Sequence, residues 1–450
     1  MKNTVHKLLP PPHWAAVLFA AVFLISLTIF CHIAGYPLVI PALVLLTGFH
    51  LFFQKSAHWK RCLYVGLLLA LMIVGVDVMI RQGHLSPLYV PVASLVMLTV
   101  FLFHDLHLGF ALSFVASVIA TMIAGGDLWL MILYFMGSLS GAYAIWGART
   151  RGQFLKAGVV IALVYIACLA MKNPSLSEIS SRTFLIQKAL PLAINAFMSS
   201  FLVMVTLRIF ERLFGVVTNY TLLELADFNQ PLLKRMMMEA PGTYQHSLAV
   251  SQLAEAAAGT IGANSLLCRV GGYYHDIGKL VTPEYFTENQ KVGPSKHDAI
   301  EPTMSRLVIL NHVKEGMELG KKYRLNPMIL NFIPEHHGTA LIHYFYHKSV
   351  EGAEVGETVE EQDFRYPGPK PQSRETAIVM LADSVEGAVR AMEEHTPARM
   401  EDVVRKVINN KFIDGQLDEC PLTLKDIYKI SQEFTRLLSA MYHGRVKYPD

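Results

Sequence analysis

The chain has 450 residues, of which 52% are hydrophobic and only 17% are charged, and its formal net charge at pH 7 is +3. This composition is too apolar for an ordinary soluble protein, and the small net charge gives no support for nucleic-acid binding. The five cysteines have no paired spacing, which argues against a disulfide framework or a cysteine zinc site. Apolar runs fill the chain up to about residue 210, and charged residues recur every few positions after it. After residue 210 the chain shows helical patterns and no sustained alternation typical of strands. We therefore predict an all-α protein with a membrane part followed by a globular part.

The first part contains eight apolar stretches that are predicted to be membrane-spanning helices. Several are shorter than the ~20 residues that a helix needs to cross the hydrocarbon core, so their ends are approximate. The first fits either a retained anchor or a signal peptide, and its length of about 20 residues favours the anchor. The stretches are roughly 14–34, 38–54, 63–80, 88–103, 107–124, 128–147, 156–171 and 189–209.

Basic residues in the short loops predict the orientation of these helices. Lys60 and Arg61 lie between the second and third stretches, Arg149 and Arg151 lie between the sixth and seventh, and Arg212 follows the eighth. By the positive-inside rule these loops face the cytoplasm, which places both termini inside and requires an even number of spans. We expect a multi-pass protein of the cell membrane, surrounded by lipid, with its globular part in the cytoplasm.

The expected domains are a polytopic transmembrane domain at 1–210, a helical linker at 211–240 and a globular domain at 241–450. Leu222, Leu223 and Leu225 give the linker an apolar stripe at helical spacing, and Pro231 and Pro241 interrupt the helical pattern after this stripe and just after the linker's end. The linker is predicted to pack beneath the membrane, to couple the two domains, or to do both.

Histidine and aspartate residues recur through the globular part, on or beside predicted helices. Imidazole nitrogens and carboxylate oxygens suit Fe, Mn, Zn and related ions. A two-metal site needs several such ligands from different helices, and an aspartate can give one oxygen to each ion. Each histidine alone is more simply a packed or surface residue, so the hypothesis depends on the whole set. The set comprises His246, His275, Asp276, His312, His336, His337 and Asp383.

The segments APGTYQHS, GGYYHDIGK, EHHGT and YPGPKPQSRE resemble the seven-transmembrane HD family, the PgpH-type cyclic di-AMP phosphodiesterases of the HD superfamily. The resemblance implies an all-helical HD domain that binds two divalent transition-metal ions, Mn or Fe. It implies one ion held by His246, His275, Asp276 and Asp383, and another held by Asp276, His312, His336 and His337. Asp276 would bridge the ions, and Lys279 would lie near the phosphate, so that both act in catalysis. Family members usually carry a large extracellular domain after the first span, whereas only about five residues separate the first two stretches here.

The segment 363–375 contains three prolines and is predicted to be a non-helical loop. By the resemblance it borders the substrate pocket, where Arg365, Lys370 and Arg374 would meet phosphates and Tyr366 would stack on a base. The alternative is a surface loop that joins two helices.

The implied function is a membrane-anchored phosphodiesterase that hydrolyses cyclic di-AMP to pApA and so regulates a second messenger. One alternative is a phosphodiesterase for cyclic di-GMP or another cyclic dinucleotide, although no Gly-Tyr-Pro follows His336-His337. The other is a non-catalytic nucleotide sensor coupled to the membrane domain. The globular part shows no broad basic face, so a nucleic-acid polymer is not expected as a partner. An oligomer is compatible with the sequence.

Overall fold

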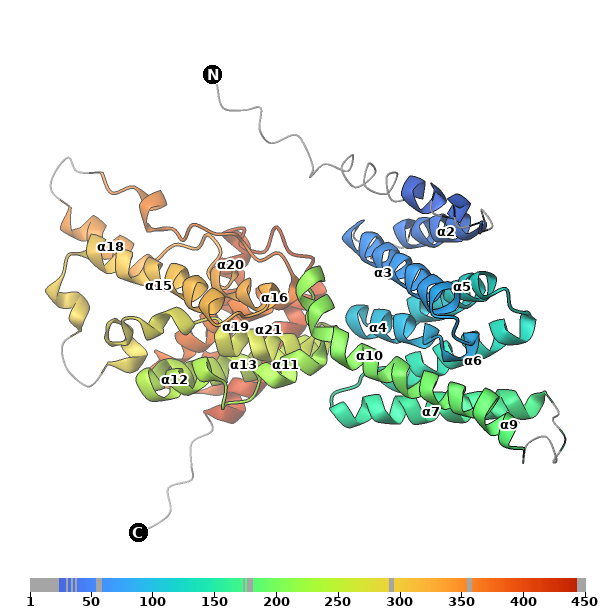
Figure 1. Ribbon diagram of the computed structural model, residues 1–450. Coiled ribbons are helices and arrows are strands. Elements are labelled where there is room, and N and C mark those ends of the chain that lie inside the picture. Colours follow the sequence, from blue (N-terminus) through green and yellow to red (C-terminus); the bar gives the residue numbers. More distant parts are fainter. Residues whose placement is uncertain are drawn as a thin grey trace, which may run out of the picture. The chain divides into compact units, whose positions relative to one another are not determined.

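The protein is described by a computed structural model (Figure 1). Its described residues are 24–29, 31–33, 35–36, 39–53, 59–172, 175, 181–290, 295–353 and 358–442. Within these ranges the chain is helical, and the β-structure is limited to an isolated bridge between Leu341 and Arg365. The predicted all-α class is thereby confirmed. The chain divides into two compact units, Met1–Thr218 and Asn219–Asp450, called here the membrane unit and the HD unit.

The membrane unit is built from apolar helices. They are α2 (Val39–Phe53), α3 (Trp59–Asp77) continued by η1 (Val78–Gln82), η2 (Pro87–Tyr89), α4 (Val92–Phe103), α5 (Leu106–Ala124), α6 (Leu128–Ile145), α7 (Arg151–Met171), α9 (Arg182–Phe184), η3 (Leu185–Ala189) and α10 (Leu190–Phe214). Five helical segments are long and apolar enough to cross a membrane: Arg61–Gln82, Leu106–Ala124, Leu128–Ile145, Arg151–Met171 and Arg182–Phe214. Each predicted stretch from the second to the eighth overlaps a helix, in order α2, α3, α4, α5, α6, α7 and α10, of which α2 and α4 are not among these five segments. The first predicted stretch lies partly outside the described residues.

The pair His104-Asp105 separates α4 from α5. His104 adopts a left-handed conformation with a φ of 55° and ends α4. The Asp105 side chain accepts a hydrogen bond from the Leu108 backbone N–H at 3.0 Å and so caps α5. Asp105 also forms an ion pair with Arg61 at 2.6 Å. This His-Asp pair therefore marks a helix boundary.

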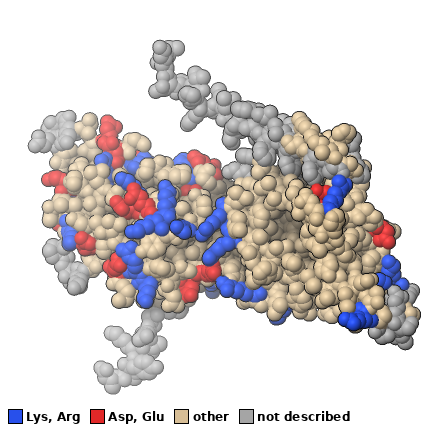
Figure 2. All heavy atoms as spheres, in the orientation of Figure 1, with Lys and Arg blue, Asp and Glu red and all other residues tan. Residues whose placement is uncertain are grey.

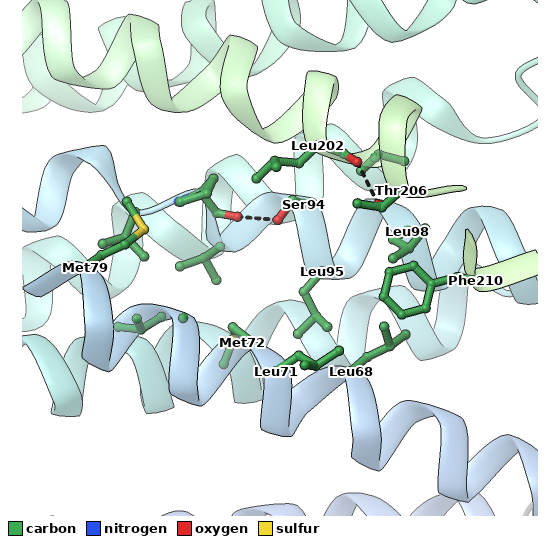
Figure 3. Close-up of a pocket in the computed structure, with 16 residues that line it drawn as sticks. Leu68, Leu71, Met72, Met79, Ser94, Leu95, Leu98, Leu202, Thr206 and Phe210 are labelled. Carbon is green, nitrogen blue, oxygen red and sulfur yellow. Dashed lines mark hydrogen bonds between the residues drawn. The ribbon is translucent and has the colours of Figure 1, made fainter. Parts of the chain in front are cut away.

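The membrane unit contains an apolar cavity of about 260 Å³ lined by residues of α3, α4 and α10 (Figure 3). Two hydroxyl groups belong to its lining. The Ser94 hydroxyl donates to the Pro91 carbonyl at 2.6 Å, and the Thr206 hydroxyl donates to the Leu202 carbonyl at 2.7 Å. Both are therefore paired with nearby backbone, and the remaining walls are apolar.

The HD unit contains the helices that carry the candidate site. They are α11 (Asn219–Leu225), α12 (Pro231–Glu239), α13 (Pro241–Ile261), α14 (Ser265–Tyr274), η4 (Ile277–Leu280), η5 (Pro283–Tyr285), η6 (Thr287–Asn289), η7 (Lys296–Ala299), α15 (Pro302–Lys322), α16 (Pro327–Leu330), α17 (Phe332–Glu335), α18 (His343–Gly352), η8 (Glu361–Phe364), α19 (Arg374–Arg390), α20 (Pro397–Ile413) and α21 (Leu424–Met441). Charged side chains cover much of this unit, whereas the visible surface of the membrane unit is mostly uncharged (Figure 2).

Helix α13 forms the centre of the HD unit and packs against α14, α19 and α21. Asn264 caps α14 by accepting the Leu267 N–H, as its position before the helix leads one to expect. Residues 219–240 of the predicted linker pack on this core, because α11 contacts α14 and α12 contacts α13. The Tyr274 hydroxyl fixes α11 by donating to the Leu225 carbonyl at 2.9 Å.

Candidate metal centre

The seven predicted ligands converge in the HD unit although they are spread over 138 positions of the chain, from 246 to 383. His246 lies on α13, His312 on α15 and Asp383 on α19, while the other four follow the ends of α14 and α17. Their donor atoms form two groups, each with all atoms within 4.8 Å of one another. The first group is His246, His275 and Asp383, and the second is Asp276, His312, His336 and His337.

Asp276 belongs to the second group and also borders the first, and its two carboxylate oxygens face the histidines of different groups. Oδ2 is 3.6 Å from His246 Nε2 and 3.3 Å from His275 Nε2. Oδ1 is 3.6 Å from the Nε2 atoms of both His312 and His336. This is the arrangement expected of a carboxylate that gives one oxygen to each of two ions.

Asp383 contacts the first group most closely. Its Oδ1 is 3.0 Å from His246 Nε2 and 3.8 Å from His275 Nε2. Its Oδ2 is 3.9 Å from His337 Nδ1. The carboxylate therefore faces the first group with one oxygen and the edge of the second with the other.

The chemistry of these donor atoms fits a metal. The Nε2 atoms of His275, His312 and His336 and the Oδ1 atom of Asp276 are buried, and none has a hydrogen-bond partner among the described residues. A buried polar atom without a partner costs about 1–3 kcal/mol. Ligand bonds of about 2.0–2.2 Å would place two donors of one ion roughly 3–3.6 Å apart. Most of the separations above fall close to that range, so an ion could satisfy several of these atoms at once.

The second ring nitrogen of each histidine determines which nitrogen is available as a donor. Three histidines give their Nδ1–H to a backbone carbonyl nearby in sequence: His275 to Gly272, His312 to Ile309 and His336 to Phe332. Because a carbonyl can only accept, Nδ1 carries the hydrogen and Nε2 keeps its lone pair. His246 differs, since its Nδ1 lies 2.5 Å from Oε2 of Glu386.

Burial and charge support this donor state for His312. Burial, assisted by the neighbouring His336 and opposed by Asp276, lowers the pKa of His312 to about 4. The imidazole is then neutral at pH 7, which is the form that binds a metal. Burial alone would also lower the pKa of His275, but the neighbouring Asp276 and Asp383 carboxylates outweigh it and raise that pKa to about 10, so an ion would have to displace a proton there. Burial alone would raise the pKa of Asp276, but the Lys279 ammonium and His275 hold that pKa well below its usual range.

Gly278 of the HDIGK motif allows α15 to approach the centre. A Cβ atom at this position would lie 1.8 Å from the His312 carbonyl oxygen and 2.5 Å from the Gly316 nitrogen. Real Cβ atoms do not approach backbone so closely, so a side chain here would push α15 away. The glycine therefore fixes the position of His312 relative to Asp276.

Lys279 lies beside the bridging position. Its Nζ is 2.7 Å from Asp276 Oδ2 and 2.8 Å from Glu288 Oε1. Burial alone would lower the pKa of Lys279, but these two carboxylates outweigh it and raise the pKa above its usual range. The side chain therefore stays an ammonium group next to the centre.

A cavity of about 440 Å³ adjoins the centre. Lys279, His312 and His337 contribute to its wall. Five aromatic residues complete much of the lining: Tyr285, Phe286, Tyr344, Phe345 and Tyr366. The carboxylates of Glu288 and Asp298 also line it, and Glu288 pairs with Lys279. The ammonium group, the imidazoles and the aromatic rings suit a ligand that combines phosphate with flat rings.

Of the four residues predicted to contact the substrate, one lines the cavity and three do not. Tyr366 lines the cavity, and its ring stacks on that of His337 with centroids 4.1 Å apart. Arg365, Lys370 and Arg374 do not belong to the lining found for this cavity.

These three basic side chains instead have partners outside the cavity. Arg365 Nη2 is 2.9 Å from Asp414 Oδ1, and Arg374 Nη2 donates to the Ile261 carbonyl at 2.7 Å. Lys370 Nζ is 3.8 Å from an Asp418 carboxylate oxygen. Their contact with a substrate stays a prediction.

Sequence reasoning missed Glu288 and Glu386. Glu288 lies in the short η6 turn, where no periodic pattern marks it. Glu386 follows Asp383 by three positions on α19, a spacing that places both on one helix face and could have indicated it. The pair His297-Asp298, which has no place in the predicted ligand order, lies in the cavity wall, and His297 is buried.

Residues 243–388 match the family model of the HD domain, and residues 33–218 match that of the 7TM receptor with intracellular HD hydrolase. The cyclic-di-AMP phosphodiesterase PgpH of Bacillus subtilis (strain 168) is 38% identical over 323 residues, which are 71% of this chain and 44% of the relative. PgpH of Listeria monocytogenes serotype 1/2a (strain 10403S) is 41% identical over 320 residues, which are 69% of this chain and 44% of the relative. The matched part thus spans less than half the length of these two relatives.

A crystal structure of the L. monocytogenes phosphodiesterase PgpH HD domain in complex with cyclic-di-AMP is 46% identical in sequence. The match covers 49% of this chain and 100% of that chain, with a TM-score of 0.46. The two family models match consecutive parts of the chain, in the order membrane segment and then HD domain. The chain therefore carries both parts that these models describe, the membrane segment of a 7TM receptor with intracellular HD hydrolase and an HD domain.

Proposed function

We propose that this chain is a membrane-anchored phosphodiesterase that hydrolyses cyclic di-AMP to pApA. The observation that carries the proposal is Asp276, whose two oxygens each face two histidine nitrogens that are 3.3–3.6 Å away. The two relatives that cover about 70% of this chain are named cyclic-di-AMP phosphodiesterases. The adjoining cavity, with its aromatic walls and the Lys279 ammonium, supports a dinucleotide as the ligand.

The seven residues would hold two divalent transition-metal ions, Mn or Fe. His246, His275, Asp276 and Asp383 would bind one, and Asp276, His312, His336 and His337 would bind the other. When bound, such ions supply hydroxide at neutral pH and neutralise charge on the attacking and leaving oxygens of a phosphate ester. The described residues offer donors of the right type, and the structure itself does not identify the ion.

The chain's own groups would orient the substrate. Lys279 holds its ammonium in the cavity wall, where it can pair with a phosphate oxygen. Tyr366 and Phe286 provide ring faces for the bases. Arg365, Lys370 and Arg374 would reach the substrate only by leaving their present partners. In the reaction one water adds to phosphorus, the bond from phosphorus to the 3′ oxygen breaks, and that oxygen takes a proton to give pApA.

The membrane placement extends the same proposal. The basic residues between the helices favour the cytoplasmic side of the cell membrane for the HD unit. We divide the chain into a transmembrane domain at 1–210, a linker at 211–240 and an HD domain at 241–450. In this arrangement the substrate is a cytoplasmic second messenger, and the membrane helices hold the enzyme at the bilayer.

The test is a hydrolysis assay on the full chain in detergent with Mn²⁺, offered cyclic di-AMP, cyclic di-GMP and a dNTP separately. We expect selective conversion of cyclic di-AMP to pApA. Asp276→Asn and His275→Ala should each lower kcat by at least about 10³-fold. Residues that act as one catalytic unit depend on one another, so removing one of them removes most of the activity. Circular dichroism should show unchanged helix content.

Asp402→Asn provides the matched control, because Asp402 lies on α20 with a side chain that is 81% exposed. This variant should keep the activity of the unmodified chain. Absence of turnover with every nucleotide would reject the proposed activity. Full activity in Asp276→Asn would reject the assignment of the centre.

A further inference from the structure

One turn of α19 contacts both ring nitrogens of His246. Asp383 Oδ1 lies 3.0 Å from Nε2, and Glu386 Oε2 lies 2.5 Å from Nδ1. Residues three apart lie on the same face of a helix, so one side of α19 holds both edges of the imidazole ring. His246 is on α13, and the packing of α13 against α19 creates this arrangement.

Glu386 is built into this position. It is only 4% exposed, and its second oxygen lies 3.4 Å from Nη1 of Arg390, one turn further along α19. Carboxylates are seldom buried so deeply without a specific partner. The two oxygens thus have separate roles: one contacts His246, and the other is held by an arginine at the unit's edge.

His246 therefore differs from the other histidines whose Nδ1 partner is known. His275, His312 and His336 give Nδ1–H to neutral backbone carbonyls, at 2.8 Å and 3.0 Å for His275 and His336. A carboxylate carries a full charge and forms the stronger hydrogen bond. It increases the electron density at the opposite nitrogen, which makes that nitrogen a better metal donor.

We propose that Glu386 is a positioning residue that fixes His246 with Nε2 toward the first group and strengthens metal binding there. This inference rests on the proposed function, because it assumes that the first group holds an ion. Among the described residues, the hydrogen-bond and ion-pair partners found for Glu386 are His246 and Arg390, and neither belongs to the second group. Loss of Glu386 should therefore lower the affinity of the first group for its ion and leave the affinity of the second group unchanged.

The experiment measures metal binding and needs no turnover. The full chain is purified in detergent, stripped with chelator and titrated with Mn²⁺, and bound metal is counted by mass spectrometry at each free concentration. The unmodified chain should bind two ions. Glu386→Ala should bind one of them about 10–100-fold more weakly, which is the usual cost of removing such an outer partner. The second ion should keep its affinity.

Two further variants separate positioning from general damage. Glu386→Gln keeps an oxygen that can accept the Nδ1–H, so its loss of affinity should be smaller than that of Glu386→Ala. Glu375→Ala removes a carboxylate from the first turn of the same helix, where it accepts a hydrogen bond from the Asn264 backbone N–H at 2.9 Å. It should bind both ions normally. Titration with Co²⁺ adds a signature, since the absorption of only one bound ion should change.

The outcomes distinguish the inference from the proposed function. Equal affinity in Glu386→Ala and the unmodified chain, or equal weakening of both ions, would overturn the inference. Glu386→Gln as weak as Glu386→Ala would also overturn it. Two bound ions without hydrolysis of any cyclic dinucleotide would reject the proposed substrate and leave the role of Glu386 intact. An unmodified chain that binds no ion would reject both.

Discussion

Buried polar side chains in the two units of this protein differ in whether they have hydrogen-bond partners. In the membrane unit the hydroxyls of Thr99, Ser113 and Ser117 each donate to the carbonyl four residues earlier, at 2.8, 2.8 and 2.6 Å. In the HD unit the donor atoms of His275, His312 and other members of the centre are buried without such partners among the described residues. Local pairing allows a polar side chain to sit within apolar helices, whereas atoms left unpaired together indicate a ligand.

Unpaired buried atoms indicate a ligand only where several of them lie close together. In the part of the chain that the structure describes, Thr121, Ser138 and Ser200 of the membrane unit also have buried hydroxyls without a hydrogen-bond partner. They are single hydroxyls of helix interiors. The atoms of the metal centre instead belong to residues whose donors lie within 4.8 Å of one another in two groups. We therefore expect substitutions near the metal centre to change stability or metal binding strongly. Substitutions of side chains that are paired with their own helix backbone should have small effects.

The largest of the remaining effects is expected for Gly278→Ala. The new Cβ would lie 1.8 Å from the His312 carbonyl oxygen, so α15 must move. We expect a loss of about 3 kcal/mol in the free energy of unfolding of the HD unit, as for a severe overpacking change. Movement of His312 should also lower the affinity of the second group for its ion. Denaturant unfolding of the full chain, followed by circular dichroism, measures the first effect.

Gly387→Ala is the matched control for this change. Gly387 lies on α19, and a Cβ there would have no other atom within 4 Å. Alanine is the better helix former by about 1 kcal/mol, so stability should stay equal or rise slightly. Equal stability of the two variants would contradict the close contact between η4 and α15.

The sequence predicted the helices well, because apolar runs and caps are local signals. Apolar stretches from the second to the eighth each overlap a helix, yet some of their ends were wrong by several residues. The helix predicted from 156 begins at Arg151, and the one predicted to stop at 209 continues to Phe214. Polar residues at helix ends still make backbone hydrogen bonds, so the apolar pattern misses the start of α7 and the end of α10. It overruns the start of α4, which begins at Val92, and the end of α6, which stops at Ile145.

The site was predictable only in part. The set of histidines and aspartates came from a family resemblance, and the opposite directions of the two Asp276 oxygens appear only in three dimensions. Glu386 could not be assigned to His246, because the two residues are 140 positions apart in sequence. The same holds for Arg365, whose partner Asp414 is 49 positions away. Contacts of this kind depend on how helices pack, which no local pattern encodes.

Asn195 offers a contrasting case within the membrane unit, because three of its hydrogen-bond partners are distant in sequence. Its Nδ2 donates to the Leu88 and Val90 carbonyls at 3.0 and 2.7 Å, and its Oδ1 accepts from the Tyr165 hydroxyl at 3.3 Å. Asn195→Ala would leave buried groups unpaired and open a small cavity. We expect a loss of about 2 kcal/mol, seen as a lower midpoint of unfolding in mixed detergent. An unchanged midpoint would show that these hydrogen bonds are replaced by others.

The smallest effect is expected for Ser117→Ala. The Ser117 hydroxyl donates to the Ser113 carbonyl of its own helix at 2.6 Å, so its removal leaves that carbonyl in the regular backbone pattern of α5. Bonds of this type add little to helix stability, and alanine is the better helix former. We expect a change of no more than about 0.5 kcal/mol in either direction, measured in the same mixed-detergent unfolding experiment as Asn195→Ala. A loss as large as that of Asn195→Ala would mean that this hydroxyl connects helices, and local pairing would then not explain how the membrane unit buries its polar groups.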